Sequence, residues 1–148
     1  MSYRYYNPNP LKLSVGDCTI RAISCALNIT WDETYCALVD LGFEMYDMPS
    51  ANRVWGQFLK INGFKKHQLP DTCPDCYTVK DFCYDFPFGT YIVGTGEHVV
   101  CVIDGNYYDS WDSELGVDMC ACVCVNVGRQ VGQSLRAFKV LRDDLRPE

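Results

Sequence analysis

A short hairpin signal in the second half of the chain constrains the fold more than any other feature of the sequence. Asp104-Gly105 stands between two apolar runs, a setting in which Asp-Gly favours a tight turn between antiparallel strands. With a two-residue turn, Ile103 faces Asn106. Counting outward places His98 and Asp109 on one face as diagonal neighbours, with Cβ atoms about 7 Å apart or less. We expect the carboxylate to accept a hydrogen bond from the imidazole.

The register decides which aspartate meets the histidine. Asp112 points to the opposite face in this pairing, and a β-bulge would exchange the two aspartates because a slip of one residue turns every side chain over. Asp109 is therefore the predicted partner and Asp112 the alternative.

Of the two histidines, His67 lies in the polar stretch "FKKHQLP" and is expected to be a solvated loop residue. His98 could also be a strand-end histidine with a satisfied hydrogen bond.

The first half of the chain has the pattern of helices. The run "CTIRAISCAL" from Cys18 to Leu27 is apolar nearly all round, with Asp17 as a predicted N-cap. A capping box of Thr30 and Glu33 predicts the next helix, with Gly42 as its end. Further helices are expected over residues 50–62 and from Thr78 onward.

After Pro87 the pattern changes to strands, so the sequence predicts an α+β domain with N-terminal helices on a C-terminal antiparallel sheet. The 148 residues fit one domain, 1–148, with a helical part over about 15–87 and a sheet part over about 88–142. The stretches "MCACVCVNV" and "LRAFKVL" are predicted strands. The tyrosine-rich start "SYRYYNP" is expected to be an edge strand or an N-terminal wrap.

Charge and hydropathy exclude several classes of function. The net charge is −6 with no basic cluster, which argues against nucleic acid as a partner. No stretch reaches the roughly 20 apolar residues that span a bilayer. The start "MSYRYYNPNP" has no apolar core of a secretory signal, so we expect a cytoplasmic protein. Its ten cysteines are then expected to be mainly free thiols.

One of these cysteines stands where its thiol can ionise. Cys18 opens the predicted helix, and the unpaired N–H groups and the dipole of a helix start stabilise an anion. The negative charge of Asp17 opposes a thiolate beside it, and Arg21, four residues after Asp17, can pair with that charge. The other interpretation of Cys18 is a small buried side chain.

A cysteine at the start of a buried helix, a later histidine at the start of a strand, and "DSW" on the next strand together resemble the papain-like cysteine proteases. The whole is also similar to small papain-fold proteins of bacteria and their phages. The resemblance covers roughly residues 7–112 and implies a papain-like fold. By position, it makes Cys18 the nucleophile, His98 the base, Asp109 the orienting residue and Trp111 the cover of the ion pair.

The resemblance departs from the family at one position. The family usually carries a glutamine shortly before the cysteine, whose amide helps to bind the oxyanion, and here residues 10–14 contain none. The nearest upstream amides are Asn9 and Asn7, and Asn9 is assigned the oxyanion role.

The sequence therefore predicts a thiol hydrolase that cleaves a peptide or isopeptide bond through an acyl-enzyme and needs no cofactor or metal. An acyltransferase differs only in the second acceptor. The alternatives are a papain-fold binding protein without activity and an interaction module stabilised by zinc. The zinc hypothesis rests on one C-x-x-C pair and on alternating cysteines later in the chain: Cys73, Cys76, Cys120, Cys122 and Cys124.

Overall fold

The predicted hairpin is present. The computed structural model describes residues 2–68, 77–94, 98–112 and 123–127, and within them β4 (Val99–Ile103) and β5 (Asn106–Asp109) form an antiparallel pair. Ile103 pairs with Asn106, as expected from the sequence. Both turn residues, Asp104 at φ 48° and Gly105 at φ 73°, have the positive φ that a two-residue turn requires.

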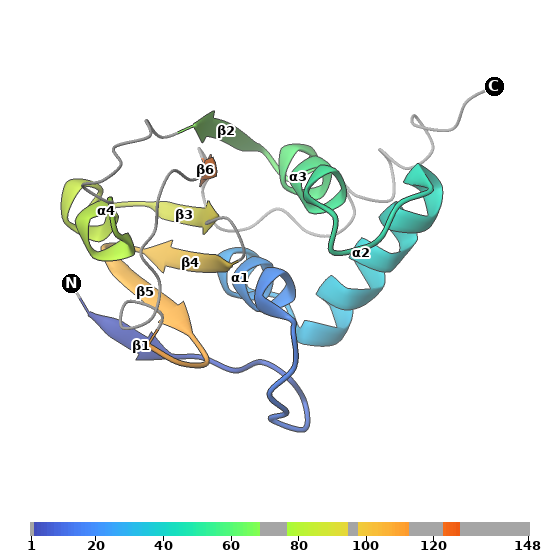
Figure 1. Cartoon of the computed structure of the whole chain (residues 1–148), viewed down its shortest axis with the longest axis horizontal. Helices are drawn as coiled ribbons and strands as arrows, with labels where there is room; N and C mark the ends of the chain where they lie inside the picture. Colours follow the sequence, from blue (N-terminus) through green and yellow to red (C-terminus); the bar gives the residue numbers. More distant parts are fainter. Residues whose placement is uncertain (1, 69–76, 95–97, 113–122, 128–148) are drawn as a thin grey trace.

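The hairpin lies inside a larger sheet (Figure 1). Across the described ranges, the strands follow the order β1-β5-β4-β3-β6-β2, with β1 (Tyr3–Tyr5) and β2 (Phe64–Gln68) at the edges and β3 (Thr90–Gly94) and β6 (Val123–Val127) between β4 and β2. The tyrosine-rich start thus forms the predicted edge strand.

Two expectations about the sheet are wrong. The sheet is mixed and not antiparallel throughout, because β1 runs parallel to β5. It also takes β2 from the part of the chain expected to be helical, and this strand includes His67, which was expected in a loop. Its sequence "FKKHQ" gives little strand signal because charged residues are common on edge strands, where they discourage pairing with other chains.

The helices begin close to where the sequence places them. They are α1 (Cys18–Leu27), α2 (Trp31–Met45), α3 (Asn52–Ile61) and α4 (Val79–Asp85). Capping boxes at Thr30 and Thr78 start α2 and α4. Helices and a mixed sheet confirm the α+β class. The single-domain prediction extends beyond the described residues and stays a prediction.

The expected end of α2 at Gly42 is wrong, because the helix continues to Met45 and ends with Tyr46 in the left-handed conformation at φ 54°. Gly42 instead allows the chain to fold back over the helix. A Cβ atom at this position would lie 2.8 Å from the backbone oxygen of Asp47. The glycine is thus required for a close approach of backbone and not for a turn.

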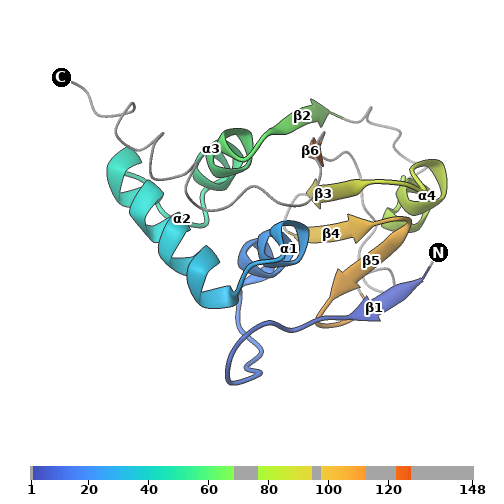
Figure 2. The ribbon, with the colours of Figure 1, turned by 180° about the vertical axis from the view of Figure 1, so that it is seen from behind.

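Both faces of the central strands are buried. Val99 and Cys101 of β4 point into a core with α1, α2 and α3, whereas Val100 and Val102 point into a second core with α4. The view from behind shows α4 separated from α1–α3 (Figure 2). Burial on both faces explains why "VVCVI" is apolar throughout. The position of β4 in the middle of the sheet fixes the place of His98, the residue just before it.

Some predicted features fall outside the described residues: the strand "LRAFKVL", the first part of "MCACVCVNV", and Cys73, Cys76, Cys120 and Cys122. In the part of the chain that the structure describes, no helix has both the length and the apolar character needed to cross a bilayer.

The close approach at Gly42 gives a first prediction. We expect Gly42→Ala to lower the free energy of unfolding by about 1–3 kcal/mol, since the added methyl meets backbone that cannot rotate away. Gly56→Ala is the matched control: Gly56 lies within α3 with nothing near its missing Cβ, and the exchange should stabilise by roughly 0.5–1 kcal/mol. Urea denaturation of both variants measures this, and equal stabilisation would contradict the close approach.

Candidate functional site

Cys18 is the first residue of α1, a helix that packs against β4. The side chain is half-buried and its thiol is free. Asp17 occupies the N-cap position, but the expectation that its side chain caps the helix is wrong, because the side chain makes no capping hydrogen bond. Both carboxylate oxygens have other partners, one on Arg21 and one on Trp31. The carboxylate of Asp17 therefore does not occupy the N–H groups at the helix start beside Cys18.

The structure brings Cys18, His98 and Asp109 together. Asp109 is the last residue of β5 and is 1% exposed. Its Oδ2 atom lies 2.5 Å from Nε2 of His98. The same imidazole forms a hydrogen bond with Cys18. Because Nε2 faces Asp109, Nδ1 is the ring nitrogen left for the thiol.

The electrostatics of the three groups favour an ion pair. Burial raises the pKa of Cys18, but hydrogen bonds from His98 and the backbone N–H of Val99 outweigh it and lower this pKa overall. Burial lowers the pKa of His98, whereas its hydrogen bonds to Asp109 and Cys18 raise this pKa to about 9. A lowered thiol pKa beside a raised imidazole pKa is the condition for thiolate and imidazolium at neutral pH.

Trp111 and Asp112 lie in different environments. The Trp111 ring lies against His98, with ring centroids 5.1 Å apart, and is still 42% exposed. It thus covers one side of the imidazole from solvent. Asp112 accepts a hydrogen bond from the hydroxyl of Tyr107 at 2.5 Å. The alternative in which Asp112 meets His98 is therefore wrong, because the hairpin has the two-residue turn that brings Asp109 to that face.

Arg21 adds a buried positive charge to the site. Arg21 is 6% exposed, and its Nη2 donates to Oδ1 of Asp109 at 3.0 Å. Its Nη1 donates to Asp17, which confirms the predicted pair. Asp17 also accepts a hydrogen bond from the indole nitrogen of Trp31 at 2.8 Å. Sequence reasoning missed the contact between Arg21 and Asp109; the signal was a single arginine in an otherwise apolar helix.

Asparagine side chains organise the loop before Cys18. Oδ1 of Asn9 accepts from the backbone N–H groups of Leu11 and Leu13 at 3.0 and 3.3 Å. Both side-chain groups of Asn7 are bound within the loop, to Asn9 N and Leu13 O. Two backbone donors on its oxygen fix the orientation of the Asn9 amide. The oxyanion role of Asn9 stays a prediction.

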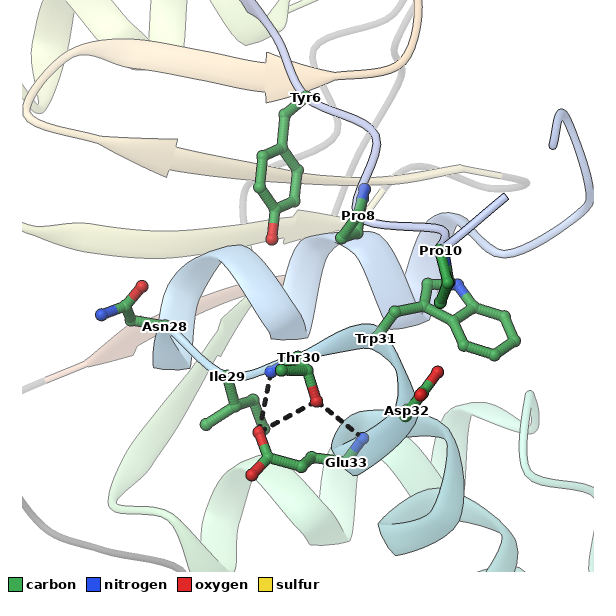
Figure 3. A pocket seen from close by; sticks show the side chains of 9 residues that line it. All are labelled: Tyr6, Pro8, Pro10, Asn28, Ile29, Thr30, Trp31, Asp32 and Glu33. Atoms are coloured by element: carbon green, nitrogen blue, oxygen red, sulfur yellow. Dashed lines mark hydrogen bonds between the residues drawn. The ribbon is translucent and has the colours of Figure 1, made fainter. Parts of the chain in front are cut away.

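A pocket of about 480 Å³ lies beside this loop. Figure 3 shows Tyr6, Pro8 and Pro10 on one side and the segment from Asn28 to Glu33 on the other. Trp31 belongs to the pocket and also donates to Asp17, the residue before Cys18. Burial and neighbouring thiols raise the pKa of Tyr6 to about 12, so its hydroxyl stays protonated and available as a donor.

The other candidate residues do not join this site. His67 is exposed on the edge strand β2 and pairs with Cys124 across the sheet. Among the described residues, no three His, Cys, Asp or Glu side chains form a group that could hold a metal ion. The zinc hypothesis depends mainly on cysteines outside these residues and stays untested.

Comparison of the chain with models of known protein families, with curated protein sequences and with solved structures gives no match.

The pKa of His98 gives a second prediction. In the folded protein, the ring signals of His98 should titrate with a midpoint near 9. Asp109→Asn removes the negative charge that stabilises the protonated ring, so the midpoint should fall toward the ordinary value of about 6.5. Two-dimensional NMR of the imidazole signals measures both titrations.

The matched control is Asp112→Asn, which removes a carboxylate that binds Tyr107 and should leave the midpoint unchanged. An Asp109→Asn midpoint that stays near 9 would show that another group sustains the protonated imidazole.

Proposed function

We propose that the protein is a thiol hydrolase that forms an acyl-enzyme on Cys18, with His98 as acid and base and Asp109 as the orienting residue. The observation that carries the proposal is the chain of contacts from the thiol through the imidazole of His98 to a buried carboxylate. A structural cysteine needs neither an imidazole partner nor a lowered pKa. The resemblance to papain-like proteases implies a papain-like fold and a peptide or isopeptide bond as the substrate.

The chemistry follows from the positions of these groups. The Cys18 thiolate attacks the carbonyl carbon, a C–S bond forms, and the carbonyl electron pair becomes an oxyanion. The backbone N–H of Cys18 and the amide of Asn9 are the proposed donors to that oxyanion. The oxyanion then collapses, the C–N bond breaks, and Nδ1 of His98 gives its proton to the leaving amine.

The second half of the reaction restores the enzyme. Neutral His98 takes a proton from water, whose oxygen attacks the thioester carbon. The C–S bond breaks, which releases the carboxylic acid and returns the thiolate beside a protonated imidazole. Asp109 remains ionised throughout and holds the ring by its Nε2 atom. A reducing compartment such as the cytoplasm keeps the thiol free for this cycle.

In this proposal, Trp111 shields the imidazole from solvent. Its ring lies against the imidazole and reduces access of water to the pair of His98 and Asp109. A less hydrated ion pair is stronger, because the effective dielectric around it is lower.

Thiol reactivity tests the proposal. At pH 6, an ordinary thiol is less than about 1% ionised, whereas a Cys18 thiolate should react with iodoacetamide at least about tenfold faster than such a thiol. Cys36, which is free and exposed on α2, is the matched reference within the same chain. Peptide mass spectrometry follows both residues over time in the wild type and in His98→Ala.

We expect His98→Ala to remove the advantage of Cys18 over Cys36, since the imidazolium stabilises the thiolate. Equal rates at Cys18 and Cys36 in the wild type would overturn the proposal and favour a binding protein without activity.

Activity on a peptide library gives a further prediction. Cys18→Ala should abolish cleavage, and Asp109→Ala should lower its rate by about 10²-fold, because a freely rotating imidazole still transfers protons part of the time. Asp112→Ala is the control and should leave the rate within about twofold, since this side chain binds Tyr107. A larger loss for Asp112→Ala than for Asp109→Ala would contradict the assignment.

A further inference from the structure

Arg21 is a buried cation that lies between two buried carboxylates. Its guanidinium lies one helical turn after Cys18 and is 6% exposed. One end of the guanidinium group binds Asp17 and the other binds Asp109. Burying a guanidinium costs several kcal/mol unless charged partners surround it, and here both partners are themselves at most 5% exposed.

The contact with Asp109 determines the orientation of that carboxylate. Oδ1 of Asp109 receives two donors, Nη2 of Arg21 at 3.0 Å and the backbone N–H of Ser110 at 2.8 Å. Oδ2 is thereby left for His98. Two donors on one oxygen restrain the rotation of the carboxylate, so Oδ2 stays directed at the imidazole.

We infer that Arg21 is a positioning residue of the proposed reaction, which fixes Asp109 as the partner of His98 and thereby sustains the thiolate of Cys18. The inference rests on the proposed function. Besides balancing the charge of Asp17, Arg21 acts on Cys18 through its contact with Asp109, which in turn contacts His98.

The planar fork of arginine is needed for this role. Asp17 and Asp109 bind different nitrogens of one rigid group, and a lysine ammonium on its flexible chain does not reproduce that geometry. The indole of Trp31 holds the far oxygen of Asp17 at 2.8 Å and so limits the movement of Asp17 and, through it, of Arg21. The orientation of Asp109 thus depends on groups from α1 and from the start of α2.

A double-mutant cycle tests the inference. Arg21→Lys, Asp109→Asn and the double variant are compared by the pH at which alkylation of Cys18 by iodoacetamide reaches half of its plateau rate. Arg21→Lys should raise this pH by about one unit, which is a tenfold loss of rate below it. In the Asp109→Asn background the same exchange should raise this pH by less than about 0.3 unit, because lysine keeps a positive charge for Asp17 and the charged contact with residue 109 is already lost. Arg53→Lys is the control at an exposed ion pair and should cause no shift.

The outcomes separate this inference from the proposed function. A wild-type Cys18 without enhanced reactivity at low pH overturns the proposed function. An enhanced wild-type reactivity that Arg21→Lys leaves unchanged overturns only the inference, as do shifts of equal size in both backgrounds, which would mean a general structural effect.

Thermal unfolding is followed for every variant. If Arg21→Lys does not fold, Trp31→Phe is used in its place to test the inference. This exchange removes the hydrogen bond to Asp17 and keeps an aromatic ring that can stack on Tyr35. A folded Trp31→Phe variant should raise the half-plateau pH by about 0.5 unit. No shift in this variant would also overturn the inference.

Discussion

The buried carboxylate of Asp109 is the constraint on which the rest of the site depends. A carboxylate that is 1% exposed is stable only when donors and positive charges surround it, and here His98, Arg21 and the N–H of Ser110 supply them. These donors come from the start of β4, from α1 and from the end of β5. The contacts of this one carboxylate therefore join α1 to the hairpin, and the same placement of the helix brings the thiol of Cys18 to the imidazole.

The charges around this carboxylate alternate in sign along the chain of contacts. Asp17, Arg21, Asp109, His98 and Cys18 each contact the next, and the positive end of α1 lies beside the last of them. Alternation allows several ionised groups to share a small, poorly hydrated volume, because each charge is stabilised by neighbours of opposite sign. It also explains why an aspartate directly before Cys18 is compatible with a thiolate: its charge is already balanced by Arg21.

Local signals predicted the elements that carry the site, and tertiary packing decided the rest. The Asp-Gly turn and the strand period placed His98 and Asp109 together, since a hairpin is short in sequence and its register follows from the turn. The contact between Arg21 and Asp109 joins residues 88 apart in sequence, and no period or spacing encodes how a helix rests on a sheet. The edge strand β2 was missed for a related reason, because its strand form depends on pairing with β6.

The sequence by itself determined the α+β class, the starts of the helices and the register of the central hairpin, because capping residues, turn residues and hydrophobic period act between near neighbours. Only the tertiary structure decided the mixed sheet, the length of α2 and which of the two expected roles of Asp17, capping the helix or pairing with Arg21, is realised. The N-cap preference of aspartate is worth about 1 kcal/mol. A buried arginine without a counter-ion costs several times more. The carboxylate of Asp17 therefore binds Arg21 and not the helix end. As a result, the negative charge next to Cys18 is paired with a positive one.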